Sequence, residues 1–214
     1  TALVTGAGAI DVSDSAGGMN VLSAVTQGVG TITLSATGGN LALGTVSASA
    51  GASAVNLTTI TSGAITDLNG GAVNVIGSTL TATAIDGIDT DTSIATLVAS
   101  VTGTGAIDVD ETDSMTVTSA TTFLGNISIL ANDGLTATLV TASTGGVGNV
   151  DLTSVNGNVI LGRVTAALDR VDVTAGRQIT DGLAGEGAAF ANVTATNLVL
   201  LSGSGVGVAD NIDT

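Results

Sequence analysis

The sequence predicts an all-β fold, a right-handed parallel β-helix (β-solenoid) of about ten coils with roughly 20 residues each. Three observations predict it. A short apolar–Asx–apolar phrase recurs along the chain, segments of alternating apolar and hydroxyl residues lie between glycine-rich turns, and the composition is aliphatic and free of proline. All three are typical of short strands stacked coil on coil, each coil contacting only its neighbours.

The recurring phrase places Asp or Asn between two aliphatic residues, and it begins at Ile10, Met19, Val55, Val73, Ile107, Val150 and Val171. From Met19 onward the successive starts are 36, 18, 34, 43 and 21 residues apart. These intervals are close to one or two multiples of a coil of about 20 residues. The step of 9 residues from Ile10 to Met19 does not fit, so the predicted period is loose.

The chain also contains a longer, tandem duplication. Gly105–Val109 repeats Gly8–Val12, and Val150–Val155 repeats the pattern of Val55–Ile60, with offsets of 97 and 95 residues. Further on, the matching phrases 39–46 and 157–164 are 118 residues apart, which indicates an additional coil in the second copy. We therefore expect one solenoid over residues 1–214, built of two tandem repeat units, about 1–94 and 95–214.

The expected strands alternate apolar residues with Thr, Ser or Asn, as in 30–35, 79–83, 126–130 and 193–198. An alternation with a period of two predicts strands with one buried face. Glycine pairs at 17–18, 38–39, 70–71 and 145–146 mark the turns between them. Strands of about 4–6 residues in coils of this length predict three short sides per coil.

Composition limits the core and the chemistry. Hydrophobic residues make up 44% of the chain, yet the only aromatic residues are two Phe, so the core must consist of Val, Ile, Leu and Ala. The absence of Pro leaves every backbone N–H available for pairing. With no Cys and no His, the serine–histidine, cysteine–histidine and most zinc mechanisms lack their residues. We therefore expect no enzyme.

The charge balance excludes nucleic-acid binding, and the hydropathy of the chain excludes a membrane span. Eighteen acidic residues stand against three Arg, giving a net charge of −15. Nucleic-acid binding needs a positive surface, so we expect no nucleic-acid partner. No uninterrupted apolar segment of about 18 residues is present, so we expect no membrane span.

The densest acidic group gives a candidate calcium site at Asp108, Asp110, Glu111 and Asp113. If Ile107 and Val109 point inward, Asp108 and Asp110 share the outward face of a strand. Oxygen-rich loops bind Ca²⁺, so this pair could chelate the ion together with Glu111 at the corner. The alternative is a solvated acidic corner without a ligand. Apart from Ca²⁺, we expect no cofactor.

Two further alternatives stay open. The Thr-x-Thr triplets that begin at residues 31, 79, 116 and 194 suggest an ice-binding face, although their spacing is irregular. A pair of carboxylates could also serve a polysaccharide-acting β-helix enzyme. Sugar subsites usually contain stacking aromatic residues, and this chain has only Phe123 and Phe190, so the enzyme is the weaker alternative.

The two ends complement each other in sequence. Residues 208–214 resemble 84–90, and Thr1–Val4 resembles the segment Ala95–Val98 that follows in mid-chain. We therefore expect the chain to associate with itself head-to-tail through open coil edges, or with adjacent repeats of a longer chain.

A family resemblance rests on short phrases. The pattern Gly-Asn-aliphatic-x-Leu-Gly-x-Val at 39–46 and 157–164, and the segment from Gly105 to Met115, resemble the β-helical repeats of large, bacterial, filamentous-haemagglutinin-like surface proteins. The resemblance implies a right-handed parallel β-helix that serves as the shaft of an extracellular or cell-surface adhesin, or as a filament subunit. No site residues of the family carry over, because no site motif is matched.

Overall fold

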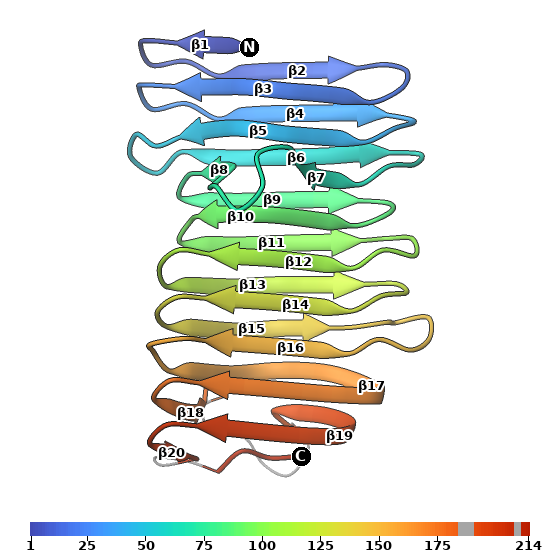
Figure 1. Ribbon diagram of the computed structural model, residues 1–214, viewed down its shortest axis with the longest axis vertical. Helices are drawn as coiled ribbons and strands as arrows, with labels where there is room; N and C mark the ends of the chain where they lie inside the picture. The colour runs from blue at the N-terminus through green and yellow to red at the C-terminus, as the bar shows by residue number, and fades with distance from the viewer. Residues whose placement is uncertain (184–190, 208–210) are drawn as a thin grey trace.

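The computed structural model describes residues 1–183, 191–207 and 211–214. Within these ranges the chain forms 20 strands and no helix, and all strand pairs are parallel. Each strand pairs with the equivalent strand of the coils before and after it (Figure 1). The predicted all-β solenoid is therefore confirmed.

The strands form two ladders, which we name column A and column B. Column A contains, in order, β1 (Ala2–Val4), β3 (Met19–Thr26), β5 (Leu41–Ala48), β7 (Ile65–Asp67) with β8 (Val75–Ile76), β10 (Ile88–Ser93), β12 (Ile107–Glu111), β14 (Ile127–Ala131), β16 (Val150–Ser154), and the second parts of β17 (Val159–Ala175) and β19 (Val193–Ser202).

Column B contains β2 (Ile10–Asp14), β4 (Ile32–Thr37), β6 (Ala54–Ile60), β9 (Thr79–Ala84), β11 (Thr96–Val101), β13 (Met115–Thr122), β15 (Leu135–Thr141), the first part of β17, β18 (Gln178–Asp181) with the first part of β19, and β20 (Gly205–Val206).

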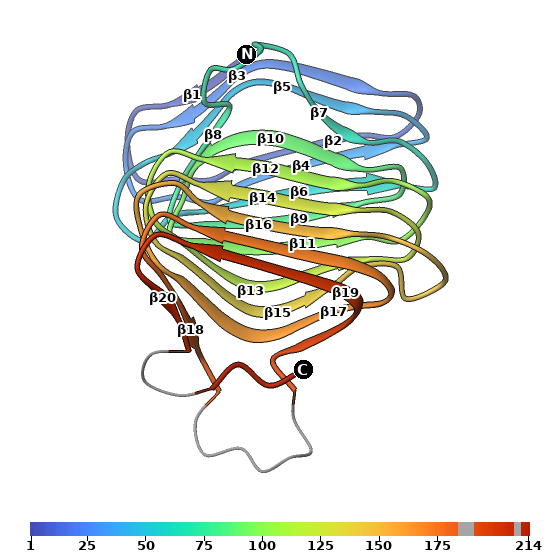
Figure 2. The same ribbon diagram turned by 60° about the horizontal axis from the view of Figure 1, so that its bottom comes forward.

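The ladders make about 8 full turns of about 22 residues each, fewer and longer than the predicted ten coils of roughly 20 residues, and the short strands β1 and β20 belong to partial turns at the two ends. In the view of Figure 1, column A lies in front and runs to the left, while column B lies behind and runs to the right as the chain descends; Figure 2 shows the same arrangement from below. This winding is right-handed, as expected for parallel strands joined by crossovers.

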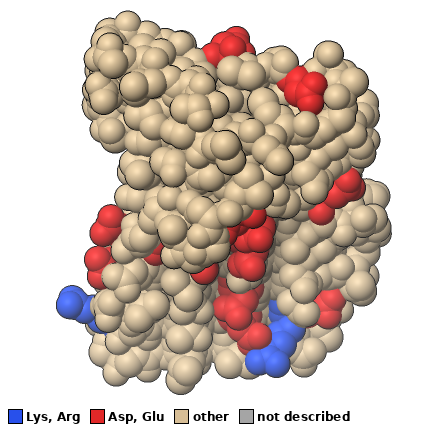
Figure 3. Space-filling view, turned by 45° about the horizontal axis from the view of Figure 1, so that its top comes forward, with Lys and Arg blue, Asp and Glu red and all other residues tan. Residues whose placement is uncertain are grey.

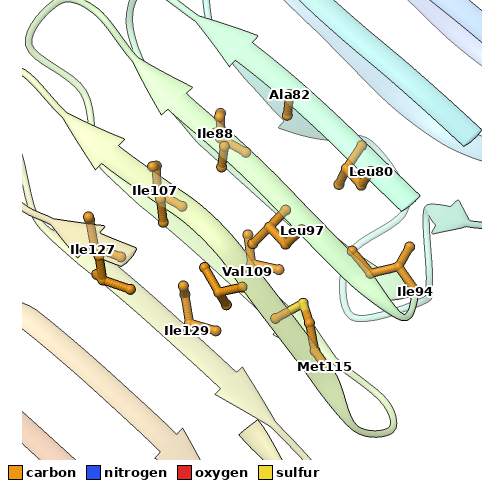
Figure 4. Packing of buried hydrophobic residues seen from close by; sticks show 14 of the residues in the cluster. Leu80, Ala82, Ile88, Ile94, Leu97, Ile107, Val109, Met115, Ile127 and Ile129 are labelled. Carbon is orange, nitrogen blue, oxygen red and sulfur yellow. The ribbon is translucent and has the colours of Figure 1, made fainter. Parts of the chain in front are cut away.

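The core consists of aliphatic rows that run along the rod. One row in column A is formed by Leu41, Ile65, Ile88, Ile107, Ile127, Val150 and Val171, all no more than 2% exposed. Figure 4 shows Ile88, Ile107 and Ile127 above one another on successive strands. Fully burying one such side chain stabilises the fold by about 1.5–3 kcal/mol. The rows explain why Val, Ile and Leu suffice without aromatic residues.

Some strands turn a corner without ending. In β3, β5, β13, β15 and β17 the inward alternation shifts by one residue, so that two successive residues lie away from the core side. Figure 2 shows the resulting bend in β13, β15 and β17. The sequence predicted three short sides per coil, whereas the described strands pair in two ladders only.

Equivalent phrases of the two repeats lie in opposite columns. Ile10 is in column B and Ile107 in column A, whereas Met19 is in column A and Met115 in column B. The bent strands change columns in the same way, since β3 and β5 belong to column A and β13 and β15 to column B. Matching residues of the two halves therefore face opposite sides of the rod.

One expected correspondence is wrong. The sequence comparison matched Thr1–Val4 with Ala95–Val98, but Ala2 pairs with Ala24 as Ala99 pairs with Ala120. Strand β1 therefore corresponds to the second half of β11, residues 99–101. With this correction the similarity runs without a gap from Ala2 through Val12, at an offset of 97 residues.

Candidate functional site

Carboxylates of two adjacent coils meet on the outer face of column A. Asp89 and Asp91 of β10 stand directly opposite Asp108 and Asp110 of β12. Their inward neighbours Ile88, Thr90, Ile107 and Val109 are buried, so the four carboxylates point outward. We name these four residues the acidic ladder.

The acidic ladder continues more sparsely along the rod. Asp108 stands opposite Ser128, which stands opposite Asp151, and Asp151 stands opposite Asp172. Asp172 accepts a hydrogen bond from Nε of Arg170 at 2.6 Å. Figure 3 shows acidic atoms gathered in a band along this face, with basic atoms near its end.

The pKa values within the acidic ladder are raised. Partial burial, followed by the charges of Asp108, Asp67 and Asp91, raises the pKa of Asp89. Partial burial and the charges of Asp67 and Asp108 raise the pKa of Asp91. The pKa of Asp110 is raised by burial and then by the other three members of the ladder. Like charges on opposed strands therefore repel each other here.

The predicted calcium ligands do not come together. Asp108, Asp110 and Asp113 are exposed, but Glu111 is only 2% exposed and points into the core. Within the described ranges, no group of three or more acidic side chains lies close enough to hold a metal ion. The outward position of Asp108 and Asp110 was predicted correctly, whereas the expected place of Glu111 beside them was wrong.

Glu111 instead closes a corner of the coil. Its Oε2 accepts hydrogen bonds from the Thr92 hydroxyl at 2.8 Å and the Ile94 N–H at 2.9 Å, and its Oε1 accepts from the Thr112 hydroxyl at 3.4 Å and the Asp113 N–H at 3.1 Å. Burial raises the pKa of Glu111, and these four hydrogen bonds partly offset the rise. The carboxylate is thus a structural acceptor for two coils.

A second outward row consists of hydroxyl groups on column B. One Ser or Thr stands at the same position of nine successive strands, from β2 to β19: Ser13, Ser35, Thr58, Thr83, Ser100, Thr121, Thr141, Thr165 and Thr194. We name this row the hydroxyl ladder. The Ser35 hydroxyl donates to Ser13 at 2.8 Å, and the Thr121 hydroxyl donates to Ser100 at 3.3 Å.

Sequence reasoning missed the hydroxyl ladder. Its members are separated by intervals that range from 17 residues (Thr83 to Ser100) to 29 residues (Thr165 to Thr194), so no fixed period reveals it. Of the Thr-x-Thr triplets that suggested an ice-binding face, only the one that begins at Thr194 contributes a residue to this row. Only the pairing register brings the hydroxyl groups together, at a spacing of about 4.8 Å.

A loop in each half of the rod is closed by the same side-chain pair. Nδ2 of Asn74 donates to Oδ1 of Asp67 at 2.6 Å, and Nδ2 of Asn192 donates to Oδ1 of Asp181 at 2.6 Å. Both asparagines then accept an N–H from the next coil, that of Asp91 at 2.8 Å and that of Asp213 at 3.0 Å. The segment around β8 and the start of β19 therefore occupy equivalent positions in the two halves of the rod.

A cavity lies at each end of the part of the rod that the structure describes. At one end, Ala2, Ile10, Val12 and Leu34 line part of a cavity of about 170 Å³. At the other end, Val193, Ala195 and Leu198 line part of a cavity of about 260 Å³. Aliphatic side chains thus border a cavity at each end of the described structure.

Within the described residues, no helix has the length and apolarity needed to cross a membrane. A search of protein-family models, of curated proteins and of solved structures finds no match to this chain. Fold and surface geometry therefore carry the functional argument.

Proposed function

We propose that this protein is a structural shaft, a stiff rod that spaces or carries other parts of an extracellular assembly. The observation that supports this proposal most is internal: the two repeats stack on each other inside one chain, with the strand ladders and the aliphatic rows running through the junction at β9, β10, β11 and β12. A unit that stacks on its own copy can extend a rod to any length.

The surface charge is consistent with a shaft. The net charge of −15 gives a self-repelling surface, which keeps rods apart laterally while their ends stay apolar. The resemblance to filamentous-haemagglutinin-like repeats favours the shaft of a bacterial surface adhesin or a filament subunit.

Small-angle scattering and electron microscopy of the purified chain test the proposal. We expect an elongated particle with a cross-section of one coil and resistance to protease along the ladders, because nearly every backbone N–H there is paired. A compact, rapidly digested particle would contradict a shaft.

The hydroxyl ladder favours a second candidate, a face that orders water at ice. Nine hydroxyl groups stand at a regular strand spacing along one face of the described structure. Thermal hysteresis of the wild type, compared with Thr121→Val and Thr141→Val, tests this candidate, and Thr116→Val is the matched control outside the ladder. Absence of hysteresis in the wild type removes it.

A further inference from the structure

We propose that the exposed edge of β19 binds β1 of a second copy of this chain in one register, with Ala2 opposite Leu200, Leu3 opposite Leu201 and Val4 opposite Ser202. This inference rests on the proposed shaft function and specifies its partner, the N-terminal coil edge of another copy.

The partner position follows from the junction inside the chain. Val75 pairs with Val46 as Val193 pairs with Val164, and both valines follow the asparagine of an Asp–Asn pair. Counting onward from these valines at the same offset of 118 residues, β9 (Thr79–Ala84) corresponds to residues 197–202 of β19. The second part of β19 is therefore the counterpart of β9.

The strand that lies on β9 is β11. Ala99 pairs with Ala82, Ser100 with Thr83 and Val101 with Ala84. Since β1 corresponds to residues 99–101, the same arrangement at the end of the rod places β1 of a second copy on residues 200–202. The internal junction is thus a template for the junction between copies.

Burial agrees with this register. At the internal junction Ala82, Ala99 and Val101 are at most 2% exposed. Their counterparts Leu200, Ala2 and Val4 face the core but are only partly buried, because none of the described strands pairs with their outer edge. Stacking would close the two end cavities and bury these side chains.

The positions of the two edges around the rod also agree with the proposed register. Strand β1 and the second part of β19 both belong to column A. A second copy therefore continues column A with β1 and column B with β2 without any rotation about the rod. The columns would not meet in this way if β1 belonged to column B.

Disulfide trapping tests the register, and the chain has no native Cys to interfere. A protein carrying Leu3→Cys is mixed with one carrying Leu201→Cys; both positions are exposed, at 59% and 62%. Directly opposed residues on parallel strands lie about 4.8 Å apart, within the range of a disulfide. The matched control replaces Leu201→Cys with Val199→Cys, two residues earlier on the same face, which places the Cα atoms about 8 Å apart and outside that range.

We expect the 3–201 pair to give cross-linked dimers at least about tenfold faster than the 3–199 pair. Faster trapping of the 3–199 pair would overturn the register. If neither pair is trapped faster than random collision at the highest attainable concentration, binding between copies is overturned. Scattering from the same samples still measures the dimensions of a single rod, so the shaft proposal is judged separately.

A fused dimer gives a second measurement that does not depend on concentration. Asp213 corresponds to Asp91 in the hydrogen bond to asparagine, so Thr214 corresponds to Thr92 and not to Thr90, where the sequence match of 208–214 with 84–90 placed it. Residues 208–210 of that match lie outside the described residues. Thr1 corresponds to Val98. Two copies joined by Ser-Ile-Ala-Thr-Leu, the sequence of residues 93–97, should form one rod of doubled length in which the N–H groups of the second β1 are protected from hydrogen exchange. Two rods that tumble independently, with β1 unprotected, would overturn the proposal.

Discussion

Asparagine side chains tie each coil to the next at the corners. Oδ1 of Asn40 accepts the N–H of Ala64 at 2.9 Å, Oδ1 of Asn126 accepts that of Asn149 at 2.9 Å, and Oδ1 of Asn158 accepts that of Gln178 at 3.1 Å. In each case the donor lies one coil further along the chain. The Gly-Asn phrase of the sequence therefore has a structural role, because its asparagine side chain accepts a hydrogen bond from a backbone N–H at the corner.

Replacing Glu111 tests how a buried carboxylate supports a corner. We expect Glu111→Ala to lower the free energy of unfolding by about 2–4 kcal/mol, since it leaves the N–H groups of Ile94 and Asp113 without their acceptor in a buried site. Glu111→Gln keeps one acceptor oxygen and should cost less than half of that. Urea denaturation measures both, and equal losses would argue against this role.

Removing one charge from the acidic ladder should stabilise the protein. Asp108 opposes Asp89 directly, and like charges on opposed strands destabilise a sheet by roughly 0.2–1 kcal/mol. We therefore expect Asp108→Asn to raise the melting temperature slightly at neutral pH and low salt. Asp113→Asn is a control on the same coil outside the ladder, and the gain should shrink as salt is added.

The raised pKa values fix the direction of the pH dependence. Asp89, Asp91, Asp110 and Glu111 hold protons more tightly in the fold than in the unfolded chain, whose values are near 3.8 for Asp and 4.5 for Glu. Their stabilisation is complete below these ordinary values and is lost as the pH rises through the raised ones. Calorimetry should give a higher melting temperature at about pH 4 than at about pH 7. A melting temperature that falls between pH 7 and pH 4 would contradict the raised pKa values.

At the scale of the strands, glycine allows two coils to approach at a bent corner. A Cβ at Gly162 would lie 2.4 Å from the carbonyl oxygen of Thr138, and one at Gly44 would lie 2.5 Å from that of Leu22. Both glycines belong to the Gly-Asn-aliphatic-x-Leu-Gly-x-Val phrase. The second glycine of that phrase is thus explained by the contact between backbones at the bend.

We expect Gly162→Ala to destabilise the rod by about 1–3 kcal/mol, because the backbones of β15 and β17 must separate at the corner. Gly6→Ala is the matched control, since a Cβ there meets nothing within 4 Å. Thermal unfolding of the two variants distinguishes the cost of the contact from the general effect of removing a glycine. A similar loss of stability in both variants would contradict a role for the backbone contact at Gly162.

The strands and the coil period could be predicted from the sequence because inward aliphatic residues alternate with polar ones. The ladders on the surface could not, because coil lengths vary from 17 residues between Leu80 and Leu97 to 29 between Val164 and Val193. Adding one residue to a corner changes which side chains stand opposite each other. The inward position of Glu111 was missed for a related reason: alternation along β12 places it with Ile107 and Val109, although its charge suggested the surface.

At the scale of the whole molecule, the number of strands per repeat determines on which side of the rod equivalent loops and charges lie. From β1 to β10 the chain occupies nine ladder positions, with β7 and β8 sharing one, so β11 begins in the other column. An odd number places equivalent loops and charges on alternate sides of the rod. We infer that a longer array of such repeats presents its features on two opposite faces.

The central claim, that the chain is one continuous stack of coils, is tested most directly by distances along the hydroxyl ladder. With no native Cys, spin labels can be placed at Ser35 paired with Thr141, Ser35 with Thr165, and Ser13 with Thr165. These pairs are five, six and seven ladder steps apart, so pulsed electron paramagnetic resonance should give backbone separations near 24, 29 and 34 Å, about 4.8 Å per step. Distances that do not increase by one strand spacing with each added step would contradict the stacked-coil structure.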